Sequence, residues 1–178
     1  HGVASAFVTV YLKRFISANL ERYRRGSSTL LTEPAELLAT LNSELLQEKI
    51  GKYIALFYAV LDTRSSEITY ANAGAFPWPL LLPGQDAGYL PLKSTPVGMF
   101  DFSSYTNHSL PLQHDSRLIL FSDGILDMLP QQGTEQKLQH LLQSCQQHSD
   151  IAALLQALDI DPTAPLPDDL TILKLSRH

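Results

Sequence analysis

Apolar residues at the start of the chain recur with the period of an α-helix. From Val3 to about Arg24 they lie three or four residues apart, with neither proline nor internal glycine between them. The pattern predicts a long helix, whose last turn carries arginines that suit the negative end of a helix dipole. A second helix is expected from Thr32 or Glu33 to about Ile50, because proline follows at a first-turn position and leucines then form a stripe.

After Gly51 the pattern becomes that of β-strands. The segment Tyr53–Asp62 is dense in aromatic and β-branched residues, and polar residues typical of a hairpin turn follow it. Further strands are expected over residues 67–71, 78–82, 88–92, 117–121 and 170–175, and further helices over 134–147 and 150–158. This order predicts one domain over residues 1–178 of the α+β class, an α-β-β-α sandwich of antiparallel sheets flanked by helices.

Aromatic side chains gather in the first two predicted strands. Tyr53, Phe57, Tyr58 and Tyr70 occupy alternating positions there. We expect these rings to pack in the core and against each other across the strands, and not to form a platform for nucleic-acid bases.

Composition narrows the class of protein. Of the 178 residues, 44% are hydrophobic, which suffices for one substantial core. The 13 basic and 18 acidic residues give a net charge of −5, which speaks against a general nucleic-acid role. No apolar stretch reaches the roughly 18 residues of a membrane span, so no membrane association is expected. The single cysteine, Cys145, excludes an intrachain disulfide, fits a reducing cytoplasm and is expected to be a packing residue.

Two carboxylates stand at the ends of short apolar strands. Asp123 follows the predicted strand that ends at Phe121, and Asp168 precedes the one that begins at Leu170. If these strands are antiparallel neighbours, both aspartates lie at the same edge of the sheet. Converging carboxylates repel unless a cation lies between them, and oxygen ligands without nearby cysteine or histidine favour Mg²⁺ or Mn²⁺ over zinc. Asp-Gly and Asp-Asp are also ordinary loop residues, so turn chemistry stays an alternative.

Four short motifs follow one another along nearly the whole chain. They are His1-Gly2-Val3-Ala4-Ser5-Ala6, Asn72-Ala73-Gly74 followed by Pro77, Ser122-Asp123-Gly124, and Asp168-Asp169-Leu170-Thr171. In this order they resemble the Gly-His-Gly turn, the Asn-Ala-Gly segment, the Thr/Ser-Asp-Gly motif and the closing Asp-Asp/Asn-x-Thr of protein phosphatase 2C-type enzymes. Residues 1–15 and 121–129 resemble most the sporulation stage II E class, as in the output domain of response regulators that control a stress sigma factor.

The resemblance implies a site for two metal ions. Asp123 and Asp168 match the family's metal-binding aspartates and are the expected catalytic residues. Gly2 lies in the turn beside the bridging-aspartate motif and is counted with the metal site, whereas Asp169 is expected to shape the loop. The implied chemistry uses two Mg²⁺ or Mn²⁺ ions bridged by a water that attacks phosphorus in line, without a covalent phospho-enzyme.

The chain departs from the family's pattern in two places. The family's bridging aspartate lies a few residues before the Gly-His-Gly turn, and a further acidic ligand lies upstream of it. Both are therefore expected before His1, together with the first strands of the sheet. The domain is expected to be N-terminally truncated, so that residues 1–178 alone hold an incomplete two-metal site. In addition, Ala75 stands where relatives often carry histidine, a change in the loop and not in a ligand.

The function implied by the resemblance is removal of phosphate from serine or threonine of a partner protein. The expected partner is a phosphoprotein such as an anti-sigma antagonist, and an upstream receiver domain in the full-length chain is expected to switch the activity. The alternative is a phosphatase-like module that binds a sigma factor or its regulator without catalysis. Retention of both Asp123 and Asp168 favours the enzyme. A homodimer is also expected, because missing strands expose a sheet edge or face.

Overall fold

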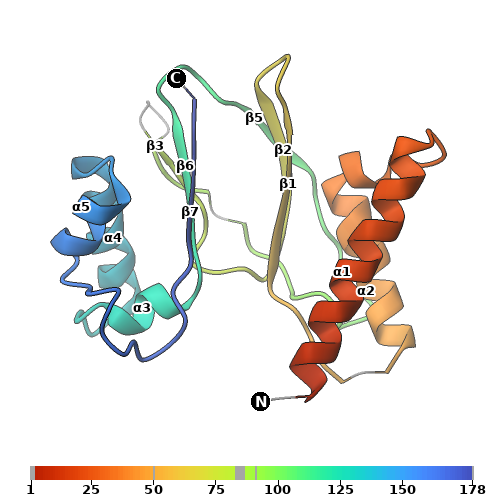
Figure 1. Ribbon diagram of the computed structural model, residues 1–178, viewed down its shortest axis with the longest axis horizontal. Coiled ribbons are helices and arrows are strands. Elements are labelled where there is room, and N and C mark those ends of the chain that lie inside the picture. The colour runs from red at the N-terminus through yellow and green to blue at the C-terminus, as the bar shows by residue number, and fades with distance from the viewer. Residues whose placement is uncertain (1–2, 50, 83–86, 91, 178) are drawn as a thin grey trace. The chain divides into compact units, whose positions relative to one another are not determined.

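The computed structural model describes residues 3–49, 51–82, 87–90 and 92–177. The chain divides into two compact units. The first consists of His1–Ala75 and Leu92–Pro111, and the second of Phe76–Pro91 and Leu112–His178. Each unit contains one antiparallel sheet with helices packed against it (Figure 1).

The first unit is built on a three-stranded antiparallel sheet with the order β1-β2-β5. Its elements are α1 (Val3–Arg24), the short 3₁₀ helix η1 (Leu30–Thr32), α2 (Pro34–Gln47), β1 (Leu56–Asp62), β2 (Glu67–Ala73) and β5 (His108–Pro111). Figure 1 shows α1 and α2 on the same side of this sheet. The position of the second helix follows from proline at its start, which has no N–H to leave unpaired in the first turn.

The core of the first unit forms between α2 and β2. Leucines of α2 that recur three or four residues apart are buried and pack against small residues of β2; they are Leu37, Leu38, Leu41 and Leu45. Helix α1 joins this core through Phe15, which is 6% exposed. The apolar stripe predicted for α1 is only partly buried, since Phe7 is 51% and Val10 67% exposed. The helix contacts the core through the part around Phe15, and these two residues precede it.

The aromatic residues of the first hairpin pack across the strands, with one exception. The Phe57 and Tyr70 rings have centroids 5.5 Å apart, and the Tyr58 hydroxyl donates to the Leu31 carbonyl at 2.9 Å. The packing prediction was wrong for Tyr53, which is 61% exposed and precedes β1. The pairing of β1 with β2 ends at Leu56 opposite Ala73. The residue after Ala73 is Gly74, whose φ of +73° turns the chain away from the strand direction.

The second unit is built on a four-stranded antiparallel sheet with the order β4-β3-β6-β7. Its elements are β3 (Leu80–Leu82), β4 (Gly88–Tyr89), β6 (Arg117–Phe121), α3 (Gly124–Met128), α4 (Thr134–Gln147), α5 (Ile151–Ala157) and β7 (Ile172–Ser176). The three helices lie on one side of the sheet (Figure 1). The turn predicted at Pro83-Gly84 lies outside the described residues.

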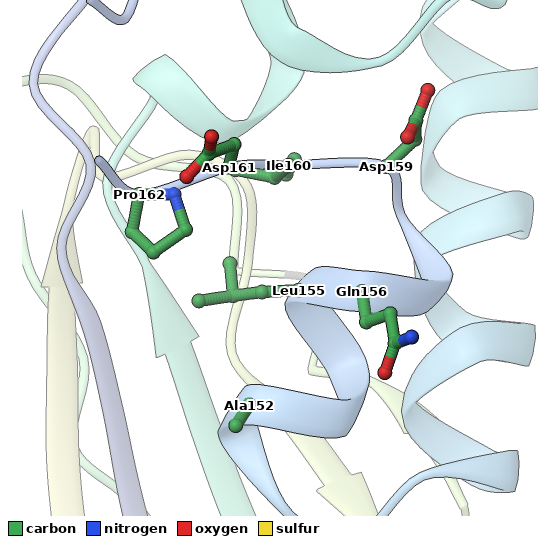
Figure 2. Close-up of a pocket in the computed structure, with 7 residues that line it drawn as sticks. All are labelled: Ala152, Leu155, Gln156, Asp159, Ile160, Asp161 and Pro162. Atoms are coloured by element: carbon green, nitrogen blue, oxygen red, sulfur yellow. The ribbon is translucent and has the colours of Figure 1, made fainter. Parts of the chain in front are cut away.

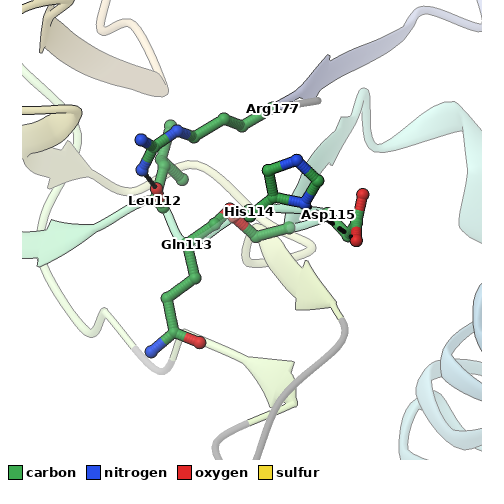
Figure 3. A network of polar contacts seen from close by, with 6 residues as sticks. Leu112, Gln113, His114, Asp115 and Arg177 are labelled. Atoms are coloured by element: carbon green, nitrogen blue, oxygen red, sulfur yellow. Dashed lines mark hydrogen bonds and ion pairs between the residues drawn. The ribbon is translucent and has the colours of Figure 1, made fainter.

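Polar contacts hold β6 and β7 in register at the end where β6 begins. Asp115 N–H donates to the Arg177 carbonyl at 2.9 Å, and Arg177 N–H donates to the Ser116 carbonyl at 3.1 Å. The Arg177 guanidinium also donates to the Leu112 carbonyl (Figure 3). Within the loop before β6, the His114 ring nitrogen Nδ1 lies 2.9 Å from the carboxylate of its neighbour Asp115, a contact local to that loop. The strand pair is thus fixed at this end, and its other end leads to the predicted aspartates.

Cys145 is a core residue of the second unit, as the sequence predicted. It is fully buried on α4 in a cluster with residues of β3, β6 and α5, among them Leu80, Phe121 and Leu154. Burial raises the pKa of the Cys145 thiol to about 12, because the apolar surroundings disfavour the thiolate. The thiol is therefore protonated near neutral pH.

We expect Cys145 to be unreactive toward a thiol-specific disulfide reagent in the native protein and to react fully in concentrated urea. The reason is that only the thiolate attacks, and the native thiol is both buried and protonated. The rate is measured from the absorbance of the thiolate that the reagent releases when it reacts with Cys145. Stoichiometric reaction within seconds in the native state would contradict this burial.

The predicted α+β class with antiparallel sheets flanked by helices is confirmed. The predicted helices 3–24 and 134–147 and the strand 117–121 have the observed boundaries, whereas η1, β5 and α3 were not predicted. The single-domain boundary stays a prediction. In the described part of the chain, no helix is long and apolar enough to cross a membrane.

Candidate metal-binding site

The candidate site lies where β6 ends and β7 begins. The two strands are antiparallel neighbours, and their ladder ends with Phe121 opposite Ile172. Asp123 follows this pair along one strand, and Asp168 precedes it along the other. The expectation that the two aspartate segments share a sheet edge is therefore confirmed. Metal binding by Asp123 and Asp168 stays a prediction.

Ser122 joins the two segments through three hydrogen bonds. Its N–H donates to the Thr171 carbonyl at 2.9 Å, and its hydroxyl accepts from the Thr171 N–H at 2.8 Å. The same hydroxyl donates to the Asp169 carbonyl at 3.0 Å. The segment that carries Asp168 is thereby tied to the residue directly before Asp123.

Gly124 lets the two backbones approach closely. A Cβ built on Gly124 would lie 2.5 Å from the Asp169 carbonyl oxygen and 3.3 Å from the Asp168 Cβ. Contacts under 3.0 Å do not occur for real Cβ atoms, so only glycine fits here without movement of the loop. Gly124 is also the first residue of α3, and Asp123 is the N-cap position of that helix.

The carboxylates themselves are exposed at this edge. Asp168 Oδ1 accepts a hydrogen bond from the Asp169 N–H at 2.8 Å, which fixes one oxygen of Asp168. Asp123 makes no side-chain capping bond to α3, and no ion pair or side-chain hydrogen bond to Asp123 occurs among the described residues. Its oxygens therefore remain open to a ligand.

These observations fit a hard divalent cation. The donors are carboxylate oxygens, the chemistry that Mg²⁺ and Mn²⁺ prefer, and no lysine or arginine within the described residues neutralises them. The described residues contain no group of three or more histidine, cysteine or acidic side chains placed to hold a metal. Gly2, the third residue counted with the metal site, lies outside the described residues. Asp123 and Asp168 are thus the part of the predicted ligand set that the structure brings together.

Lys137 supports the segment after Asp123 and was not anticipated from the sequence. Its ammonium group, on the first turns of α4, donates to the Leu126 carbonyl of α3 at 2.5 Å. A cation near the positive end of its own helix is unfavourable, whereas here it meets a carbonyl of a neighbouring helix. The only hint of this contact in the sequence is a lysine near the start of a predicted helix, where a positive charge is unfavourable.

The Asn72-Ala73-Gly74 motif forms a tight turn in the first unit. Asn72 is buried, and its side-chain amide donates to the carbonyls of Leu92 at 2.7 Å and Ala75 at 3.2 Å. Gly74 has a φ of +73°, and its N–H donates to the Ser94 hydroxyl at 3.0 Å. A Cβ at Gly74 would lie 2.6 Å from the Pro96 ring. The motif holds the segment 92–96 against the end of β2.

Gly74→Ala is expected to lower the free energy of unfolding more than Gly51→Ala does. Both glycines have positive φ, at +73° and +65°, so both substitutions carry a left-handed backbone cost of about 1–2 kcal/mol. Only Gly74 adds a clash, because nothing lies within 4 Å of a Cβ at Gly51. Overpacking should add about 1–3 kcal/mol, measured by urea unfolding. Equal losses in the two variants would show that the Pro96 contact carries no cost.

Two surface grooves lie elsewhere and contain neither predicted aspartate. One, of about 410 Å³, is lined by residues at the end of α5, among them Leu155, Asp159 and Asp161 (Figure 2). The other, of about 580 Å³, lies between the end of α1 and the β1–β2 turn and is lined by residues that include Tyr23 and Arg64. Neither Asp123 nor Asp168 is among the residues that line the two grooves.

Comparisons with known proteins agree with the arrangement of the motifs. The chain matches the family described as Stage II sporulation protein E (SpoIIE) over residues 1–178. It is 29% identical to phosphoserine phosphatase RsbP of Bacillus subtilis (strain 168) over 135 residues, which cover 71% of this chain and 31% of RsbP. The chain thus spans about a third of the length of that relative.

Two solved structures share the fold at low sequence identity. The RsbU and RsbW domains of Rv1364c from Mycobacterium tuberculosis match with a TM-score of 0.64 at 19% identity, over 92% of this chain and 46% of that chain. The Mn-presoaked phosphatase domain of the cell fate determinant SpoIIE from Bacillus subtilis matches with a TM-score of 0.55 at 15% identity, over 79% of this chain and 64% of that chain.

Proposed function

The chain belongs to the SpoIIE family, and from that membership we propose that it is a metal-dependent protein serine/threonine phosphatase domain. The observation that carries the proposal is the juxtaposition of the Asp123 and Asp168 segments by Ser122 and Gly124. Two carboxylates at one exposed edge, without a protein cation between them, form a favourable place for divalent cations.

In this proposal Asp123 and Asp168 bind Mg²⁺ or Mn²⁺ as part of a two-ion site. Bound ions would supply an activated water and neutralise charge on the phosphoryl oxygens. The chain's own contribution is positional: the hydrogen bond from the Asp169 N–H orients the Asp168 carboxylate, and Gly124 allows the Asp123 segment to approach it. Exposure of both aspartates leaves room for a phosphorylated side chain of another protein.

The proposed substrate is phosphoserine or phosphothreonine on a sigma-factor regulator of the antagonist type. RsbP is named a phosphoserine phosphatase, and the SpoIIE structure is that of a phosphatase domain. Because the chain spans only part of these relatives, the activity and partner of the whole protein are part of the proposal, as is control by a receiver domain. Titration with Mn²⁺ and Mg²⁺ would decide between the two metals.

The first experiment is Mn²⁺-dependent hydrolysis of a phenyl phosphate and of a phosphoserine peptide by the full-length protein that contains this domain. The proposal predicts turnover that requires the metal and stops with a chelator. A folded protein that binds Mn²⁺ but hydrolyses neither substrate nor a phosphorylated sigma-factor regulator would contradict it. Binding of the unphosphorylated regulator by that inactive protein would then favour the non-catalytic module.

A further inference from the structure

The Ser122 hydroxyl continues the β6–β7 ladder one step beyond the strands. In a hydrogen-bonded antiparallel pair, two opposed residues exchange both of their backbone hydrogen bonds. Here Ser122 N–H donates to the Thr171 carbonyl at 2.9 Å, but the return bond from the Thr171 N–H goes to the Ser122 hydroxyl at 2.8 Å. The side chain therefore takes the place of the Ser122 carbonyl.

This replacement frees the Ser122 carbonyl for the turn that follows. That carbonyl accepts from the Ile125 N–H at 3.3 Å, which starts the turn into α3 directly after Asp123. The chain can thus leave the strand at Asp123 while the opposite segment remains attached. The hydroxyl also donates to the Asp169 carbonyl at 3.0 Å, so it acts as acceptor and donor at the same time.

From this geometry we infer that Ser122 is a positioning residue that sets the spacing of the Asp123 and Asp168 segments and thereby the metal affinity of the site. The inference rests on the proposed function. Metal ligands must be placed within about 0.2 Å, and groups that orient ligands from behind typically contribute about 10–100-fold to metal affinity. Ser122 holds both segments and is not itself expected to be a ligand.

The side-chain chemistry at this position is restrictive. Ser122→Ala leaves the Thr171 N–H and the Asp169 carbonyl without their partner, so the segment before β7 loses two of its three ties to β6. Ser122→Thr keeps the hydroxyl and should retain both bonds. A matched control is Ser144→Ala, because Ser144 is 6% exposed in the same unit and its hydroxyl donates to the His140 carbonyl at 2.9 Å within α4.

The test is a calorimetric Mn²⁺ titration of the full-length wild-type protein and these three variants, with urea unfolding of each. Ser122→Ala should bind Mn²⁺ about 10–100-fold more weakly, while Ser122→Thr and Ser144→Ala stay within about threefold of wild type. The hydrolysis rate at saturating Mn²⁺ should recover in Ser122→Ala. Wild-type affinity in Ser122→Ala, or equal weakening in Ser144→Ala, would overturn the inference.

Amide hydrogen exchange in the metal-free protein separates this inference from the proposed function. Exchange at the Thr171 N–H should be faster in Ser122→Ala than in Ser122→Thr, because only the threonine retains the acceptor. If the wild type binds no Mn²⁺, the proposed function fails and the affinity claim fails with it. Unchanged exchange in Ser122→Ala would refute the positioning role even if the wild type binds Mn²⁺.

Discussion

Asp123→Asn is expected to lower Mn²⁺-dependent turnover of a phosphoserine peptide by more than about 100-fold. Asparagine has nearly the shape of aspartate but lacks the negative charge that attracts a divalent cation. Removal of a group that only orients a metal ligand already lowers metal affinity or activity by about 10–100-fold, so loss of a ligand itself should lower activity further. Initial rates over a range of Mn²⁺ concentrations in the full-length protein give the effect, and excess Mn²⁺ should restore little of the rate.

The matched control is Asp159→Asn. Asp159 is an exposed aspartate of the same unit, and its φ of +57° is a conformation that asparagine tolerates well. It lines the groove at the end of α5 and is not part of the predicted ligand set. Turnover should stay within about twofold of wild type. Full activity in Asp123→Asn, or an equal loss in both variants, would exclude Asp123 as a metal ligand.

The sequence carried enough information to predict the edge that bears the two aspartates. The strand Arg117–Phe121 is a short, largely apolar run that lies between the polar residues Ser116 and Ser122, and such boundaries can be read from the local sequence. The second aspartate precedes another apolar run that becomes β7. Once two such strands are assumed to be antiparallel neighbours, the position of Asp123 and Asp168 at one edge follows from geometry alone.

The unpredicted elements are those with too little periodicity. Helix α3 has five residues and β5 has four, so neither completes a pattern that distinguishes helix from strand. Contacts between residues far apart in the sequence could not be predicted from it either. Asn42 lies within the leucine stripe of α2, yet its side chain accepts from the Gly98 N–H at 2.7 Å and donates to the Phe100 carbonyl at 3.0 Å. Such a partner 56 residues away has no local signature.

The structure also changes the reason for glycine beside Asp123. The sequence allowed Asp-Gly to be ordinary turn chemistry, in which glycine supplies a positive φ. Positive φ occurs at Gly26, Gly51, Gly74 and Gly98, whereas Gly124 is the helical first residue of α3. What Gly124 provides is the missing Cβ, because the Asp169 carbonyl occupies that space. Gly124 and Asp169 are 45 residues apart in the sequence, so the close approach of their backbones cannot be inferred from the Asp-Gly dipeptide.

Gly124→Ala is therefore expected to disturb the site through the backbone. The new Cβ would lie 2.5 Å from the Asp169 carbonyl oxygen, and a backbone atom cannot move aside as a flexible side chain can. The segment with Asp168 must shift, which should lower the free energy of unfolding by about 1–3 kcal/mol and Mn²⁺-dependent turnover by at least about 10-fold. In Gly88→Ala, which places its Cβ in open space in the same unit, both quantities should stay near wild type. Urea unfolding and initial rates measured on the same preparations separate the two effects. Loss of stability without loss of turnover would show that Asp168 does not depend on this contact. Wild-type values for both would show that the close approach is absent in solution.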